Sequence, residues 1–269
     1  MNTMKILRSR RSVRSFDSAG LPQAVQEEIL QYAQKAENPY GLAIHWQILS
    51  AKADRLSSPV ITGADTYIAG RMDRVPHAEE AFGFAFEKVV LYAQSKGIGT
   101  TWIGGTMDRS AFERAIGLKE GEVMPCVSPL GVPAKKMSLR ETMMRKAIKA
   151  DTRLPFESLF FAGGFETPLS KASAGDLADA LEMVRLAPSA VNKQPWRLVI
   201  DGSLVHFYEK HDKGYVGADG WDMQKIDLGI ALCHFVCGME ERGKKATLLL
   251  QDPGLVPPAN TEYIATLSF

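Results

Sequence analysis

Two long stretches of the chain have the hydrophobic pattern of buried helices. In residues 81–97, apolar side chains recur every three or four positions, which is the period of an α-helix. Residues 226–243 repeat this pattern, and each stretch is apolar around most of its circumference. We therefore expect two long helices that are buried between layers or between halves of the molecule. Each has a glycine near its start and ends at another glycine 14 positions later; the pairs are Gly83 with Gly97 and Gly229 with Gly243.

The elements around these helices also occur twice, in the same order. A shorter helix leads through a loop to an apolar strand that begins at a tryptophan, and a second strand, the long helix and a further strand follow. The matching segments are residues 27–36 and 179–187 for the shorter helices, Trp46 and Trp196 for the strand starts, and residues 100–103 and 246–250 for the last strands. This order predicts an internal duplication with halves of residues 1–165 and 166–269, without a low-complexity linker between them. The alternative is that an α+β chain alternates similar elements by chance, which the matching glycine and tryptophan positions disfavour.

Composition and charge exclude several classes of protein. The 269 residues include 32 Lys and Arg against 31 Asp and Glu, so a formal charge of +1 gives no overall field for nucleic acid or an anionic membrane surface. Hydrophobic residues at 45% and charged residues at 23% are ordinary values for a folded chain. The longest apolar-rich run has 12 residues, whereas a membrane span needs about 20. Three cysteines and no secretory signal pattern favour a reducing compartment, so we expect a cytoplasmic protein without nucleic-acid or membrane partners.

The first candidate motif is the basic segment RRSVR at residues 10–14. Arg10, Ser12 and Arg14 alternate, so in an extended segment they project to the same side. They can then present two guanidinium groups and a hydroxyl to a single phosphate. On this motif alone, the alternative of a solvated basic surface stays open.

The second candidate is the loop APSAVNKQPW at residues 187–196. Pro188 ends the preceding helix, and Ser189, Asn192 and Gln194 offer both hydrogen-bond donors and acceptors. Such a loop can bind a planar heterocycle and its polyol tail. The alternative is a helix-terminating turn whose polar side chains bind only local backbone groups.

The third candidate is the glycine-rich stretch GIGTTWIGG at residues 97–105. Glycines allow a ligand to approach the backbone closely, so the amides of Gly104 and Gly105 can face a ligand directly. The stretch lacks the GxGxxG spacing of a Rossmann dinucleotide site, and no segment matches a P-loop.

Together these three segments resemble the nitroreductase family of FMN-dependent oxidoreductases. Members of that family carry an RRSxR-like segment, a PSxxNxQPW-like loop and a GxGTxWIGG-like strand. Two further stretches are similar to family patterns: LGVPAKK at residues 130–136 and RLPFESL at residues 153–159. The resemblance implies an α+β, nitroreductase-like fold with central sheets and long buried helices.

The two halves depart from the family pattern in complementary ways. Family members are usually homodimers that bind two FMN molecules with residues from both chains. The first half has RRSVR and WIGG, but residues 37–46 read ENPYGLAIHW where the PSxxNxQPW loop is expected. The second half keeps that loop but lacks the RRSxR segment and WIGG. The resemblance therefore implies a duplicated single-chain variant of the TM nitroreductase type: two fused half-units form an intramolecular pseudo-dimer with one FMN site, and a monomer suffices.

The resemblance also assigns residues to the FMN. The phosphate and the lower ribityl chain would be held by Arg10, Arg11, Ser12, Arg14 and Arg153. The ribityl chain and the ring would be reached from the second half by Pro188, Ser189, Ala190, Asn192 and Gln194. The backbone near flavin N5 would be that of Ile103, Gly104 and Gly105. No side chain is expected to act as a nucleophile.

The activity that the resemblance implies is hydride transfer from NAD(P)H through FMN to a small-molecule electron acceptor, such as a nitroaromatic or a quinone, with ping-pong kinetics. Two alternatives stay open. One is another reaction of the superfamily, such as reductive dehalogenation or flavin fragmentation. The other is a flavin-binding or sensory module with little turnover.

Histidine and cysteine positions do not indicate a metal site. Cys233 and Cys237 lie one helical turn apart, but a four-ligand site would need partners that the neighbouring sequence does not supply. The remaining histidines, including His211, are expected at polar surface or hydrogen-bonded in the core. We therefore expect no bound metal.

Overall fold

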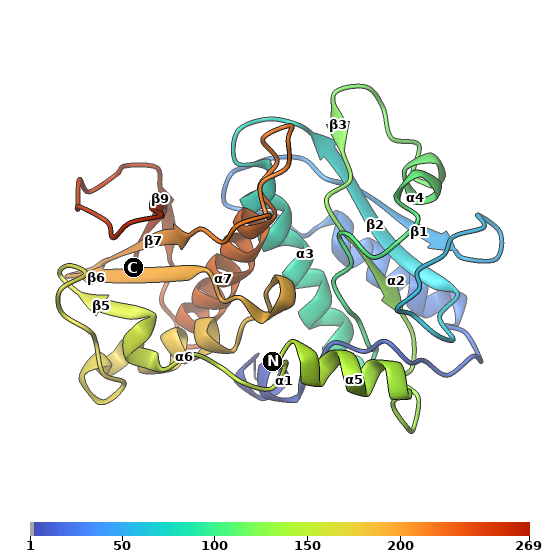
Figure 1. Cartoon of the computed structure of the whole chain (residues 1–269), viewed down its shortest axis with the longest axis horizontal. Coiled ribbons are helices and arrows are strands. Elements are labelled where there is room, and N and C mark those ends of the chain that lie inside the picture. The colour runs from blue at the N-terminus through green and yellow to red at the C-terminus, as the bar shows by residue number, and fades with distance from the viewer. Residues whose placement is uncertain (1–2) are drawn as a thin grey trace. The chain divides into compact units, whose positions relative to one another are not determined.

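The computed structural model describes residues 3–269, which form two compact units (Figure 1). The N-terminal unit consists of Ser9–Ala78 and Ala85–Lys149. The C-terminal unit consists of residues 3–8, Glu79–Phe84 and Ala150–Phe269. These spatial units differ in their boundaries from the repeated sequence halves, which describe the order of elements and stay a prediction.

The sheet of the N-terminal unit is built around its longest strand. The strands are β1 (His45–Ser50), β2 (Thr66–Asp73), β3 (Glu122–Val123) and β4 (Val127–Leu130). The other three strands all pair with β2 in antiparallel register. The strand expected at residues 100–103 is instead two isolated bridges, because Thr100 pairs with Ser12 whereas Ile103 pairs with Val127. The backbone changes partners between these positions, so no regular strand forms.

Helices and a compact apolar cluster complete the N-terminal unit. Its helices are α2 (Gln23–Gln34), α4 (Arg109–Ala115), α5 (Leu139–Ala147) and the later part of α3 (Ala78–Ser95). Asp108 and Ser138 cap α4 and α5, since their side chains accept hydrogen bonds from backbone N–H groups of the first turn. Beneath the sheet, the ring of Phe112 meets that of Tyr67 edge to face at 5.2 Å.

The C-terminal unit has a five-stranded sheet in the order β5, β6, β7, β9, β8. The strands are β5 (Phe160–Ala162), β6 (Trp196–Asp201), β7 (Leu204–Lys210), β8 (Thr247–Leu249) and β9 (Thr261–Ser268). The first pair, β5 with β6, is parallel and the other pairs are antiparallel. The α-helices are α1 (Thr3–Ser9), α6 (Ala178–Leu186) and α7 (Met223–Glu240), and the 3-10 helices are η1 (Phe156–Ser158), η2 (Ala172–Leu177) and η3 (Ala190–Asn192). The long helix α7 packs against α6 and against β6 and β7 (Figure 1).

Both predicted long helices are present, as α3 and α7, and each has 18 residues. The two expected strand tryptophans also lie in strands, Trp46 in β1 and Trp196 in β6. After each long helix, the chain adopts a left-handed conformation at the predicted glycine, with φ 76° at Gly97 and 69° at Gly243. Glycine favours this position because it has no Cβ to clash.

Within the C-terminal unit, the first turns of α3 approach α7 at a pair of glycines. A Cβ atom added to Gly83 would lie 2.1 Å from the carbonyl oxygen of Ile226, and one added to Gly229 would lie 2.1 Å from that of Glu80. Each glycine therefore faces the residue three positions before the other glycine. Such reciprocity is typical of elements related by a two-fold axis, and it supports the duplication.

Within residues 3–269, no helix combines the length and the apolar content that a membrane span requires.

Candidate functional site

The basic segment of the N-terminal unit is extended, as its alternating pattern predicts. Val13 donates its backbone N–H to the Thr100 carbonyl at 2.8 Å, and Phe16 donates to the Thr62 carbonyl at 2.9 Å. Both apolar side chains are buried and anchor the segment. The intervening Arg14 is thereby held on a fixed backbone rather than on a mobile surface loop.

Arg10 and Arg14 have buried guanidinium atoms, with charged groups of both signs nearby. Burial is the largest cause that lowers the pKa of each, and Arg145 on α5 lowers both further, whereas Glu87 raises that of Arg10 and Glu141 raises that of Arg14. Among the described residues, neither Arg10 Nε nor Arg14 Nη1 finds a hydrogen-bond acceptor. Buried cationic donors without acceptors are costly, so this donor set fits an anion such as a phosphate.

The Arg11 side chain forms an ion pair within the N-terminal unit. Its Nη1 lies 2.7 Å from Oε1 of Glu141, whose side chain is fully buried at the start of α5. Arg11 therefore fixes α5 beside the basic segment. Neither Glu141 nor Arg145 was identified from the sequence, because α5 lies far along the chain from the basic segment.

The glycine-rich stretch is fixed on one side and open on the other. Ile103 exchanges two backbone hydrogen bonds of 2.9 Å with Val127. Arg109 donates from Nη2 to the Gly104 carbonyl at 2.5 Å and from Nη1 to the Met124 carbonyl at 2.7 Å. A Cβ atom added to Gly105 would meet nothing within 4 Å. The Gly104 carbonyl is thus held by Arg109, and the backbone at Gly105 is accessible.

The polar loop lies in the C-terminal unit and has a strained backbone. Val191, Asn192 and Gln194 all have positive φ values, of 50°, 59° and 53°. Non-glycine residues adopt this left-handed region rarely, and such strain concentrates at functional sites. Ser189 stabilises the loop, because its Oγ accepts a hydrogen bond of 2.9 Å from the Gln194 backbone.

The structure brings Arg153 to this loop. Its Nη1 lies 3.3 Å from Asn192 Oδ1, and its Nη2 donates to the Leu186 carbonyl at 3.2 Å. The buried Gln194 accepts the backbone N–H of Leu154 at 2.8 Å through Oε1. These side chains therefore join the segment around residue 153 to the loop. If they also bind a cofactor, they do so in addition to this structural role.

Asp227 on α7 accepts a hydrogen bond from the backbone of the polar loop. Its two carboxylate oxygens lie 3.1 and 3.0 Å from the Ala190 backbone nitrogen. Burial raises the pKa of Asp227 well above its usual value, the Ala190 N–H lowers it, and the charge of Asp222 raises it further. Asp227 was not identified from the sequence, because the Ala190 N–H that it accepts lies 37 positions earlier in the chain.

These features define an α+β protein with an ordered arginine segment, an accessible glycine backbone and a strained polar loop. A family model described as "Putative TM nitroreductase" matches residues 2–239, and the chain belongs to this family. The family resemblance seen in the sequence is therefore confirmed. The coarse class of the chain is accordingly a nitroreductase-type oxidoreductase.

Solved structures give the fold. A protein described as a "putative nitroreductase" from Thermotoga maritima is similar over 100% of this chain and 94% of its own, with 20% identity and a TM-score of 0.66. This likeness confirms the predicted nitroreductase-like α+β fold.

Two half-length matches have lower scores. A nitroreductase with bound FMN from Bacteroides fragilis matches 52% of this chain and 92% of its own, at 19% identity and a TM-score of 0.42. An FMN-dependent nitroreductase from Clostridium difficile matches 52% of this chain and 94% of its own, at 18% identity and a TM-score of 0.42. No curated protein sequence matches the chain.

Proposed function

We propose that the protein is an FMN-dependent oxidoreductase that uses NAD(P)H to reduce a small acceptor such as a nitroaromatic or a quinone. Membership of the nitroreductase family supports the reaction class. The observation that carries the cofactor assignment is the pair of buried guanidinium donors, Arg10 Nε and Arg14 Nη1, that have no acceptor among the described residues. The terminal phosphate of FMN supplies the acceptors that they lack.

The N-terminal unit would hold the phosphate end of the cofactor. Arg10 and Arg14 donate to the phosphate oxygens, and Ser12 adds its hydroxyl from the same side of the extended segment. Arg145 contributes positive charge from α5. The backbone of Gly104 and the accessible Gly105 would serve the ring, since a side chain there would hinder close approach.

The loop of the C-terminal unit would contact the ribityl chain and the ring, as the family resemblance assigns. Pro188, Ser189 and Asn192 are partly exposed, whereas Gln194 is buried and binds the Leu154 backbone. Ser189 and Asn192 are therefore the stronger candidates for direct contact, and Gln194 preserves the loop shape. When bound, FMN supplies the chemistry of accepting a hydride and passing electrons on, so the residues of the chain need only bind, orient and exclude water.

The test is an absorption spectrum of the purified full-length chain before and after anaerobic addition of NADH or NADPH. We expect a yellow protein with bound FMN whose visible absorbance is bleached by at least one of the two donors and restored by a quinone. Bound FMN that neither donor bleaches would favour the flavin-binding module. A chain that binds no FMN, even when the cofactor is added in excess, would overturn the proposal.

A further inference from the structure

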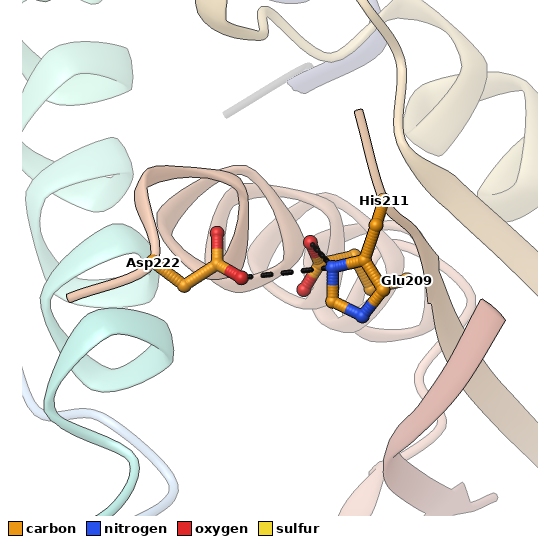
Figure 2. A group of neighbouring side chains, drawn as sticks. All are labelled: Glu209, His211 and Asp222. Atoms are coloured by element: carbon orange, nitrogen blue, oxygen red, sulfur yellow. Dashed lines mark ion pairs between the residues drawn. The ribbon is translucent and has the colours of Figure 1, made fainter. Parts of the chain in front are cut away.

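A second cluster of ionisable side chains lies in the C-terminal unit, where β7 ends and α7 begins (Figure 2). Glu209 is near the end of β7, His211 follows the strand, and Asp222 immediately precedes α7. None of these residues belongs to the set assigned to FMN. The cluster therefore requires its own explanation.

The local fold determines how these three residues meet. The His211 backbone donates to the Asn260 carbonyl at 2.9 Å, which extends the pairing beyond β7. Asp222 caps α7 because its Oδ1 accepts the Gln224 backbone N–H at 2.9 Å. Gln224 in turn accepts the Asp212 backbone N–H at 2.7 Å. These bonds hold both chain segments and leave the other Asp222 oxygen, Oδ2, facing His211.

The spacing of the polar atoms matches that of ligands around one cation. His211 Nδ1 lies 2.9 Å from Glu209 Oε1 and 3.7 Å from Asp222 Oδ2 (Figure 2). One ligand atom from each residue lies within 4.8 Å of the others. Metal bonds of about 2.0 to 2.2 Å place neighbouring ligand atoms roughly 2.9 to 3.5 Å apart, so only a small adjustment would complete a shared centre.

Glu209 provides a separate indication of a ligand. Its side chain is completely buried, and neither carboxylate oxygen makes a hydrogen bond with any of the described residues, although Oε1 forms the ion pair with His211. Asp222 and Glu262 add two further carboxylates around His211, and Lys225 is paired with Glu262 at 2.8 Å. A divalent cation would satisfy the buried oxygens and offset this concentration of negative charge.

We propose that Glu209, His211 and Asp222 bind one divalent transition-metal cation of the Zn²⁺ class and that this cation joins the end of β7 to the start of α7. One imidazole with two carboxylates favours such a cation over Mg²⁺ or Ca²⁺, which prefer oxygen ligands alone. Glu262 Oε2 faces the other ring nitrogen of His211 at 3.6 Å, where an outer carboxylate commonly orients a metal-bound histidine. The His211 side chain is 30% exposed, so a cation can reach the site from solvent. This site is independent of the proposed flavin chemistry and revises the expectation of a metal-free chain.

The experiment is a Zn²⁺ titration of the full-length chain, purified without a histidine tag and treated with chelator, followed by calorimetry. We expect one high-affinity equivalent and a higher unfolding temperature with Zn²⁺. Glu209→Gln, His211→Ala and Asp222→Asn should each weaken binding at least about tenfold and remove the thermal shift. Asp222→Asn keeps an oxygen for the helix cap and Glu209→Gln keeps the shape, so both should fold.

The matched control is His45→Ala, which removes an exposed imidazole from the N-terminal unit. It should leave Zn²⁺ binding unchanged. A Co²⁺ titration gives a second readout, since the visible spectrum of the bound ion should appear with the natural chain and not with Glu209→Gln. The proposal is overturned if Zn²⁺ does not bind, if the three cluster variants bind it as the natural chain does, if His45→Ala abolishes binding, or if Mg²⁺ competes equally.

Discussion

Arg14 is the residue whose surroundings most directly require an anion. Its buried Nη1 has no acceptor among residues 3–269, although Glu141 and, to a smaller extent, Arg145 act on it through their charges. We expect Arg14→Ala to weaken FMN binding about 10- to 100-fold, because charged hydrogen bonds contribute about 1.5 to 3 kcal/mol. Arg14→Lys should lose less FMN affinity than Arg14→Ala, because it keeps the positive charge. It should still bind more weakly than the natural chain, because it lacks the planar guanidinium. Quenching of flavin fluorescence in a titration measures both.

Arg114, an exposed arginine on α4 of the same unit, is the matched control for Arg14. Arg114→Ala removes one positive charge without touching the basic segment, and its FMN affinity should equal that of the natural chain. Equal affinities for Arg14→Ala and Arg114→Ala would show that Arg14 does not contact the cofactor.

Asp227 gives a prediction about pH because its pKa is raised in the folded chain. The folded state keeps the proton over a range in which the unfolded chain has lost it, so this residue makes the free energy of unfolding fall as the pH rises above about 4. Asp227→Asn keeps an oxygen for the Ala190 N–H and cannot ionise. Its stability relative to the natural chain should therefore increase between about pH 5 and about pH 8, as urea unfolding would measure.

The control for this pH prediction is Asp201→Asn, which neutralises an exposed carboxylate at the end of β6. Its stability relative to the natural chain should change little over the same pH range. If Asp227→Asn behaves in the same way as Asp201→Asn, the buried carboxylate is ionised and the assignment of its proton is wrong.

At the level of elements, the crossing of α3 and α7 in the C-terminal unit depends on two glycines. A methyl group at Gly229 would lie 2.1 Å from the Glu80 carbonyl oxygen, and one at Gly83 would meet Ile226 at the same distance. Rigid backbone must then move, so we expect Gly229→Ala and Gly83→Ala each to destabilise the chain by about 1 to 3 kcal/mol. Urea unfolding measures the loss.

Gly164→Ala is the comparison for the glycine crossing, because a Cβ atom there would meet nothing within 4 Å. Its stability should stay within about 0.5 kcal/mol of the natural chain. If Gly229→Ala is as stable as Gly164→Ala, the two helices can separate without cost, and their close approach is not required.

The two long helices could be predicted from the sequence, whereas several contacts between distant segments could not. Hydrophobic periodicity and two glycine spacings identified both long helices, because these signals are local. The tie between Arg11 and Glu141 spans 130 positions, and the tie between Ala190 and Asp227 spans 37, so no local pattern reveals them. The strand expected at residues 100–103 was wrong for a related reason, since its pairing depends on two distant segments.

The cation cluster was beyond sequence reasoning for a further physical reason. His206, five positions before His211, is hydrogen-bonded to Thr266, and Asp222 looks like an ordinary helix cap. Only the buried and unsatisfied Glu209 distinguishes the group, and burial at the end of a strand is set by tertiary packing. The motifs that matched a family were found from the sequence, whereas the proposed cation site was not.

At the level of the whole molecule, the duplicated sequence leads to a prediction about stoichiometry. The RRSVR segment occurs in the first half and the PSAVNKQPW loop in the second, and neither half has both. If both segments are needed, one chain has the parts for one FMN. We expect one equivalent of FMN per chain of 29.5 kDa when the cofactor is released by denaturation and measured by absorbance against protein concentration.

Native mass must be measured in the same preparation, because one FMN per chain in a dimer would not show that a monomer suffices. A mass near 29.5 kDa with one FMN is the expected result. Two equivalents per chain would contradict the loss of a second site. Two variants test whether only the second-half loop contributes to an FMN site. One is Asn192→Ala in that loop, and the other is Asn38→Ala in the segment that stands in its place in the first half. Only the former should lower the FMN content, since Asn38 binds the Leu42 carbonyl and nearby backbone of its own turn.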